Sequence, residues 1–176
     1  MKKLIFFGVA FATMFFLFSS CSKGTKTELT VEQKATIQKE VKDQWVKQRT
    51  TIRQLNFDGW SEFVSNEFIA GIRATNYELS RTAWMDTIKK SFLLRERHQS
   101  ELLEETITAL TPDLAIGTQI AIWDNWWKNG DYRKVKGSTT VLWKKEPDGW
   151  KIIYVHESRL KLLEEKLVSQ PLKNMD

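Results

Sequence analysis

The sequence predicts an α+β domain in which helices pack on one face of a bent antiparallel sheet. Up to residue 93, apolar residues recur at the spacing of helical faces. After His98, long strand-like stretches alternate with turn sequences such as Asn129-Gly130 and Asp148-Gly149. Helices followed by a meander of strands favour a sheet that is covered by helices on one side.

The chain opens with a segment typical of an export leader. Lys2 and Lys3 precede an apolar run of 15 residues, Leu4 to Phe18. This run is shorter than the ~20 residues that a membrane-spanning helix needs. It leads into Leu17-Phe18-Ser19-Ser20-Cys21, which resembles a bacterial lipobox. The resemblance implies cleavage before Cys21, alkylation of its thiol by diacylglycerol and acylation of the new amino terminus.

Cys21 is the only cysteine in the sequence, so neither a disulfide nor a cysteine-based metal site is expected. A lone thiol is a liability in an oxidising compartment, and lipidation removes it. A plain signal peptide or an uncleaved anchor is the alternative. Residues 22–30 are polar and are expected to form a flexible tether. Because no acidic residue directly follows Cys21, the lipoprotein resemblance favours the periplasmic side of the cell envelope.

Three helices are predicted in the first half of the chain. Thr30 and Gln33 have the spacing of a capping box at the start of the first helix. Asp58 is the expected cap of a short second helix, and Ser80 or Thr82 that of the third. The apolar residues expected on the inner faces of these helices are Val31, Ile37, Val41, Trp45, Ile52, Leu55, Trp60, Phe63, Val64, Trp84, Met85, Ile88, Phe92 and Leu93.

The second half is predicted to be mostly strands. The expected strands are residues 68–73, 101–110, 114–127, 132–145 and 150–158. A charged amphipathic segment follows at residues 159–168. The resulting organisation is a leader at 1–20, a lipidated cysteine and tether at 21–30, one domain at 31–158, and a C-terminal segment and tail at 159–176.

The composition is that of a globular protein, with 41% apolar and 28% charged residues. Loss of Lys2 and Lys3 with the leader leaves 25 Lys and Arg against 22 Asp and Glu, a net charge of +3. Basic residues are scattered among acidic ones, so no nucleic-acid partner is expected. His98 and His156 are the only histidines and lack ligand-like spacing, and no glycine-rich phosphate loop is present. Neither a metal nor a cofactor is expected.

Four motifs of the second half occur in the order typical of one superfamily. They are Asp113-Leu114-Ala115, Val141-Leu142-Trp143-Lys144-Lys145, Asp148-Gly149-Trp150-Lys151-Ile152 and His156-Glu157-Ser158. With them the chain resembles the SnoaL-like branch of the NTF2-like superfamily. The resemblance implies a cone, in which a strongly curved sheet wraps around about three helices and leaves an apolar pocket open at one end. Members include polyketide cyclases, steroid isomerases, dehydratases and proteins that only bind or dimerise.

The last predicted strand carries the first candidate site. Side chains alternate along a strand, so one face is expected to carry Trp150, Ile152, Tyr154, His156 and Ser158. The resemblance implies that this face lines the pocket. There His156 can serve as a general base or a hydrogen-bond donor, with Tyr154 or Tyr77 beside it. The alternative is a buried histidine that only stiffens the mouth of the cone.

Tryptophans carry the second candidate site. Alternation places Trp123, Asn125 and Trp127 on one face of their strand, and Asp124 and Trp126 on the other. Exposed indoles suit stacking on a flat ligand or a dimer interface, whereas buried indoles build a core. Asp124 is better explained as a solvated hairpin carboxylate than as a catalytic base. The tryptophans expected at a pocket or an interface are Trp45, Trp123, Trp127, Trp143 and Trp150.

We therefore expect a lipid-anchored envelope protein whose domain binds a small apolar or amphipathic molecule without catalysis. A metal-free isomerase or cyclase that uses His156 is the second expectation. A structural module that dimerises sheet to sheet, or that joins an envelope complex, is the third. The expected partners are membrane lipid through acylated Cys21, a small apolar ligand and a second copy of the chain.

Overall fold

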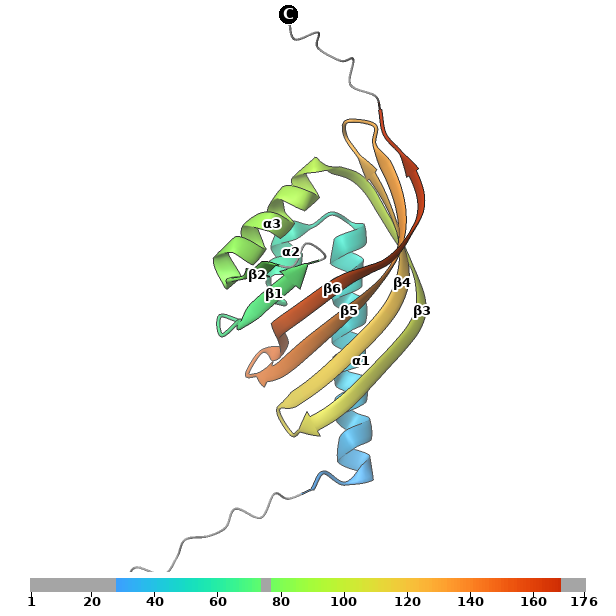
Figure 1. The fold of residues 1–176 in the computed structure, drawn as a ribbon. Helices are drawn as coiled ribbons and strands as arrows, with labels where there is room; N and C mark the ends of the chain where they lie inside the picture. The colour runs from blue at the N-terminus through green and yellow to red at the C-terminus, as the bar shows by residue number, and fades with distance from the viewer. Residues whose placement is uncertain (1–27, 74–76, 169–176) are drawn as a thin grey trace, which may run out of the picture.

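The computed structural model describes residues 28–73 and 77–168; the leader and Cys21 lie outside them. The helices are α1 (Val31–Arg53), α2 (Phe57–Ser61) and α3 (Arg81–Leu94) (Figure 1). The strands are β1 (Ala70–Arg73), β2 (Tyr77–Leu79), β3 (Arg95–Thr111), β4 (Leu114–Trp127), β5 (Tyr132–Glu146) and β6 (Gly149–Lys166).

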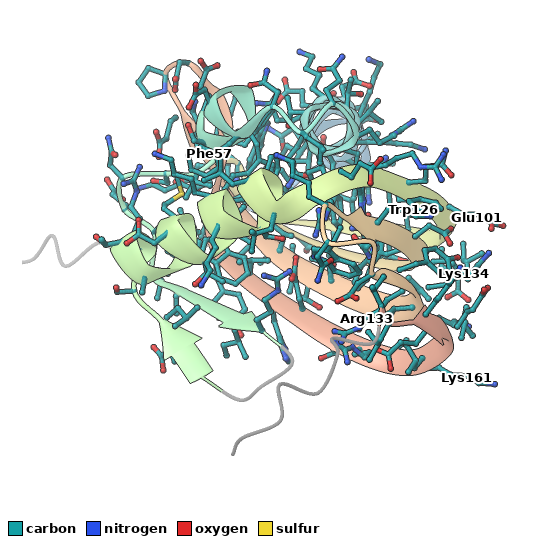
Figure 2. The ribbon with its side chains drawn as sticks, turned by 90° about the horizontal axis from the view of Figure 1, so that it is seen from above. Phe57, Glu101, Trp126, Arg133, Lys134 and Lys161 are labelled. Atoms are coloured by element: carbon teal, nitrogen blue, oxygen red, sulfur yellow. The ribbon has the colours of Figure 1, made fainter. Side chains whose placement is uncertain are left out.

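All of these strands belong to one sheet, in the order β2-β1-β6-β5-β4-β3. Neighbouring strands are antiparallel, except that β1 and β6 run parallel. The long strands curve strongly, and the helices form a second layer on the concave side of the sheet (Figures 1 and 2). The prediction of an α+β fold, with a curved antiparallel sheet packed on N-terminal helices, is confirmed.

Side-chain caps fix the start of the two longer helices. Thr30 Oγ1 accepts a hydrogen bond from the Gln33 backbone N–H, and the Gln33 side chain accepts one from the Thr30 backbone N–H. This is the predicted capping box of α1. For α3 the cap is Ser80, whose side chain accepts from the Ala83 backbone N–H.

The predicted cap of α2 is wrong by two residues. Asn56, not Asp58, is the cap, and its side chain accepts from the Gly59 backbone N–H at 3.0 Å. The reason lies in Leu55, which has a φ of 53° and so turns the chain sharply at the end of α1. Asn56 is then the first residue in extended conformation, and Asp58 already lies inside the helical turn.

Two strands are longer than predicted. β3 begins at Arg95, because the chain passes from the end of α3 directly into extended conformation. β6 continues through residues 159–166, and its pairing with β5 extends to Lys166 opposite Tyr132. Part of the segment predicted to follow the domain therefore belongs to the sheet.

Two residues predicted to face inward are exposed instead. Leu93 is 62% exposed, because the buried stripe of α3 runs through Trp84, Ile88 and Phe92 at intervals of four residues. Val31 is 78% exposed, since the buried stripe of α1 runs through Ile37, Val41 and Trp45 and leaves Val31 on the solvent side.

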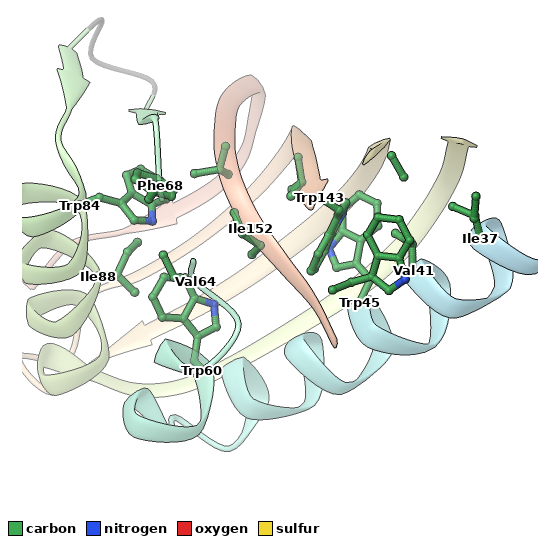
Figure 3. Packing of buried hydrophobic residues seen from close by; sticks show 14 of the residues in the cluster. Ile37, Val41, Trp45, Trp60, Val64, Phe68, Trp84, Ile88, Trp143 and Ile152 are labelled. Carbon is green, nitrogen blue, oxygen red and sulfur yellow. The ribbon is translucent and has the colours of Figure 1, made fainter. Parts of the chain in front are cut away.

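Tryptophan rings fill the core between α1 and the sheet (Figure 3). Trp45 and Trp143 pack edge to face with 5.9 Å between ring centroids. Trp45 also lies directly over Gly117 of β4, where a Cβ atom would be 2.4 Å from its Cζ3. Trp150 is held by its indole N–H, which donates to Glu40 Oε2 of α1 at 2.9 Å. Large rings thus occupy the space left by small residues opposite them.

The members of the main core cluster run in sequence from Leu29 to Val155, and all of them belong to the described residues. Within the described ranges, no helix is long and apolar enough to cross a membrane.

Candidate functional site

A cavity of about 200 Å³ lies between the helices and the concave face of the sheet. It is smaller than the ~300–1,000 Å³ pockets that hold drug-sized ligands, so it suits a small molecule. Residues on its wall include Trp45, Trp60, Trp84, Phe92, Arg95, His98, Trp123, Asn125, Trp127, Arg133, Val135, Val155, Glu157 and Arg159.

Aromatic rings form the apolar part of this wall. Trp45, Trp123 and Trp127, expected at a pocket or an interface, all line the cavity. Trp143 and Trp150 do not line it; they are buried in the core, at 0% and 3% exposed. The rings come from α1 and β4, with Trp60, Trp84 and Phe92 added from α2 and α3, and aliphatic side chains of β5 and β6 complete the apolar wall.

The opposite face of β4 carries Asp124 and Trp126, in agreement with the predicted alternation. Tyr132 donates its hydroxyl proton to Asp124 Oδ1 at 2.6 Å, and this hydrogen bond, more than burial, raises the pKa of Tyr132 to about 12. The guanidinium of Arg97 lies 3.6 Å from the centre of the Trp126 ring. Asp124 thus has a hydrogen-bond partner on the outer face and takes no part in the cavity.

Arg95 places a buried positive charge at the cavity. It stands at the junction of α3 and β3 and is only 9% exposed. Its Nη2 donates to Ser91 Oγ at 3.0 Å, while its Nε has no hydrogen-bond partner within the described residues. Burial first, and then the charge of Arg73, lower the pKa of Arg95 to about 10, against the opposing effect of Glu157. The group therefore remains charged at neutral pH.

Other arginines on the wall are paired or exposed. Arg73 Nε lies 3.2 Å from Glu157 Oε2, and Arg133 pairs with Glu165. Arg159 is exposed. In the part of the chain that the structure describes, Arg95 forms no such ion pair. In that part Arg133 Nε also lacks a hydrogen-bond partner, but Arg133 has Glu165 as its counter-ion. Arg95 is thus the buried arginine of the described wall that has no counter-ion of its own.

His98 is the histidine that lines the cavity. Its Nδ1 lies 2.9 Å from Asn125 Oδ1, so a neutral ring donates there and leaves Nε2 as an acceptor. Burial, followed by the nearby charge of Arg95, lowers the pKa of His98 to about 4, and the Asn125 hydrogen bond opposes this shift only in part. At neutral pH the ring is uncharged. Within the described residues, no group of three or more His, Cys, Asp or Glu side chains is arranged so that it could hold a metal ion.

The prediction that His156 faces the pocket is wrong. A β-bulge in β6 is the reason: Leu142 of β5 pairs with Tyr154 and Trp143 with Ile152, so Ile153 is an extra residue. One extra residue reverses the alternation beyond it. Val155 and Glu157 therefore line the cavity, whereas His156 is exposed on the outer face and is paired with Thr140.

The remaining predicted site residues do not assemble around the cavity. Tyr154 shares the outer face with His156 and does not line the cavity. Ser158 borders the cavity, but its Oγ lies 3.2 Å from His156 Nε2 on the outer face. The side chain of Tyr77 and the whole of Cys21 lie outside the described residues.

Sequence reasoning missed Arg95, His98 and Asn125. One signal was present for Asn125, because alternation already placed it on the same strand face as Trp123 and Trp127. The other two lie on the part of β3 that begins six residues before the predicted strand. With the strand boundary wrong, the face of those residues could not be assigned.

The fold and the cavity wall come from a segment that also matches a known family. The family model described as "Calcium/calmodulin dependent protein kinase II association domain" matches residues 40–161, which is more than half of the chain. The chain belongs to this association domain family. No curated protein sequence matches it significantly.

Solved structures show the same fold as this association domain family member. A candidate scytalone dehydratase from Novosphingobium aromaticivorans has a TM-score of 0.70 and 8% identity, covering 84% of this chain and 100% of that one. A candidate dehydratase of the NTF2-like family from Streptomyces avermitilis has a TM-score of 0.65 and 16% identity, and the match covers 72% of this chain and 98% of that one. The association domain of the C. elegans calcium/calmodulin dependent protein kinase II has a TM-score of 0.60 and 11% identity, and the match covers 72% of this chain and 98% of that one. At these identities the likeness concerns the fold alone, and the prediction of an NTF2-like cone is confirmed.

Proposed function

We propose that this association domain family member binds a small amphipathic anion in the cavity between its helices and its sheet. The apolar body of the ligand packs against the tryptophan wall. Its carboxylate or phosphate group pairs with the guanidinium of Arg95. This proposal narrows the expectation of an apolar or amphipathic ligand to one that carries a negative charge.

The observation that carries the proposal is the unpaired guanidinium of Arg95. Burial of a charge without a partner is unfavourable by several kcal/mol, so a buried cation normally has an anion beside it. A carboxylate can accept two parallel N–H bonds from a guanidinium, and the free Nε of Arg95 lies on one such donor edge. An anionic ligand would supply the partner that the chain itself does not provide within the described residues.

The cavity favours binding over proton transfer. A general base works best when its pKa is near the working pH, and the pKa of His98 lies at about 4. The carboxylate on the described wall, Glu157, is paired with Arg73. His156, the residue on which the isomerase or cyclase expectation rested, is on the other face of the sheet. Catalysis of that kind therefore has weaker support than binding.

Paired probes test the proposal. The chain from Ser22 onward is titrated with phenylacetate and with 2-phenylethanol, and with short alkyl carboxylates and phosphates beside their alcohols, while tryptophan fluorescence is followed. We expect the anions to bind at least about tenfold more tightly than the matched alcohols, the range of one charge-assisted hydrogen-bonded pair. Arg95→Met should remove this preference, whereas Arg97→Met, which removes an exposed charge outside the cavity, should keep it. Equal affinity for acids and alcohols, or no binding of any anion, would contradict the proposal.

A second candidate function is self-association through the outer face of the sheet. Partly exposed apolar side chains follow one another there on β4 and β5: Ile116, Ile120, Ile122 and Leu142. The match to an association domain supports this reading, and apolar patches of this kind favour interfaces. Light scattering should give a dimer or larger assembly that Ile120→Lys dissociates. A monomer at every concentration would rule it out.

We further propose that the protein is anchored in the cell envelope through acylated Cys21 and faces the periplasm. The lipobox-like residues and the lone thiol support this proposal. It is independent of the cavity, because no described residue of the cavity wall comes before Trp45 in the sequence.

A further inference from the structure

Exposed apolar side chains gather on segments that adjoin the cavity wall. They include Leu93, Leu94, Leu162, Leu163, Leu167 and Val168, each at least 40% exposed. We call the segments that carry them, residues 89–97, 127–136 and 159–168, the mouth rim. Trp127, Arg133 and Arg159 of the same segments line the cavity, so the rim adjoins the cavity wall.

These segments lie together at one end of the molecule. The Lys128 backbone N–H donates to the Leu94 carbonyl at 3.0 Å, which joins the end of α3 to the hairpin between β4 and β5. The Val168 backbone N–H donates to Asp131 Oδ1 at 3.1 Å, which joins the end of β6 to the same hairpin. Figure 1 shows this end at the top, opposite the start of α1.

The mouth rim is also strongly basic. Its three segments contain 11 Lys and Arg against 4 Asp and Glu, a net charge of +7. The rest of the chain has 16 against 18, a net charge of −2. Figure 2 looks down on this end and shows Arg133, Lys134 and Lys161 on β5 and β6. The basic balance of the protein is thus concentrated where the leucines are exposed.

We infer that the mouth rim docks on an anionic lipid surface. Leucines interleaved with lysines suit the interface of a bilayer, where the apolar side chains enter the headgroup region and the ammonium groups meet lipid phosphates. Lysine, by contrast, is depleted in the core of protein–protein interfaces. The rim is a membrane contact separate from Cys21, because α1 begins at the opposite end of the molecule.

Vesicle sedimentation tests the inference. The chain from Ser22 onward, which contains the complete core but not the acylated cysteine, is mixed with phosphatidylcholine vesicles with and without phosphatidylglycerol. We expect sedimentation only with phosphatidylglycerol and release at high salt. Leu162→Glu combined with Leu163→Glu should weaken binding at least about tenfold, since it replaces two apolar contacts by two negative charges.

A matched control exists on β3. Leu102 and Leu103 are 42% and 40% exposed, close to the 43% and 40% of Leu162 and Leu163, but they lie outside the mouth rim. Their double replacement by Glu should leave vesicle binding unchanged. Circular dichroism is used to check that both variants fold. Arg95→Met should also leave vesicle binding unchanged, because Arg95 belongs to the rim only by its place in the sequence: its side chain is buried at the cavity and is only 9% exposed.

Several results would overturn the inference. One is a protein that does not sediment with vesicles that contain phosphatidylglycerol. Another is an equal loss of vesicle binding in both leucine variants. A third is loss of vesicle binding in Arg95→Met, which would mean that the cavity captures lipid. A rim variant that changes only the oligomeric state in light scattering would identify the rim as a contact between copies instead. None of these results depends on whether the cavity binds phenylacetate.

Discussion

Trp123 on β4 lies directly against Gly137 on the neighbouring strand β5. A Cβ atom at residue 137 would be 2.1 Å from Cζ3 of the Trp123 ring, far inside van der Waals contact. Because Trp123 lines the cavity, this glycine determines how far the ring sits back toward the sheet. The shape of the cavity therefore depends on a residue that has no side chain of its own.

Replacement of Gly137 by Ala should push the Trp123 ring into the cavity. We expect a loss of about 1–3 kcal/mol in the free energy of unfolding, which is typical of overpacking, together with weaker binding of phenylacetate. Urea unfolding and the fluorescence titration measure the two effects. A second replacement, Trp123→Leu, should recover part of the stability because it removes the ring that clashes. A Gly137→Ala protein with unchanged stability and binding would show that the ring has room to move.

His98 should make the stability fall in mild acid. Its folded pKa of about 4 lies below its ordinary value of 6.5, so between these values the unfolded chain binds a proton that the folded protein does not. The free energy of unfolding then falls as pH falls through this window, by about 2 kcal/mol from about pH 7 to about pH 5. Urea titrations at both values measure the difference.

Two variants separate His98 from the rest of the protein in that experiment. His98→Gln should flatten the pH dependence, while His156→Gln, a change on the exposed outer face, should retain it. An unchanged slope in His98→Gln would mean that burial of this ring does not control the acid sensitivity.

A buried ion pair connects α1 to the edge strand β3. Arg49 pairs with Glu105, their side chains are 12% and 9% exposed, and Arg49 also donates to Gln119 Oε1 at 3.2 Å. Glu105→Ala should reduce the free energy of unfolding by about 3–5 kcal/mol, because it leaves a buried cation without its anion. The exposed neighbour Glu104→Ala should change it by less than about 0.5 kcal/mol. Similar small losses in both variants would show that Arg49 is solvated.

If Cys21 is lipidated, replacing it should abolish acylation of the protein. In cells supplied with labelled palmitate, the full chain should carry the label and sediment with membranes. Cys21→Ala should carry no label, because no other thiol is present. Label retained by the alanine variant would place the acyl group elsewhere and refute the lipobox assignment.

Much of the fold could be predicted because local signals agree with the tertiary structure. The Thr30 capping box, the Asn129-Gly130 hairpin and the apolar strands 114–127 and 132–145 each specify a local conformation that packing then retains. The Trp123 and Trp127 positions on the cavity wall follow from the same simple alternation, since β4 has no bulge between them.

The site was harder to predict because it depends on irregularities of the strands that no sequence pattern indicates. Ile152 and Ile153 are both buried, at 2% and 6% exposed, so the bulge between them looks like an ordinary apolar strand. That single extra residue moves His156 out of the cavity and brings Glu157 in. Arg95 follows two leucines at the end of a helix, and its burial depends on the abrupt start of β3, which no turn residue announces.

A crystal structure with phenylacetate bound is the most direct test of the proposed anion site. We expect the carboxylate within hydrogen-bond distance of the Arg95 guanidinium, including its Nε, and the phenyl ring against the wall formed by Trp45 and Trp123. A structure in which the acid lies outside the cavity, or lies inside it with the carboxylate away from Arg95, would contradict the proposal.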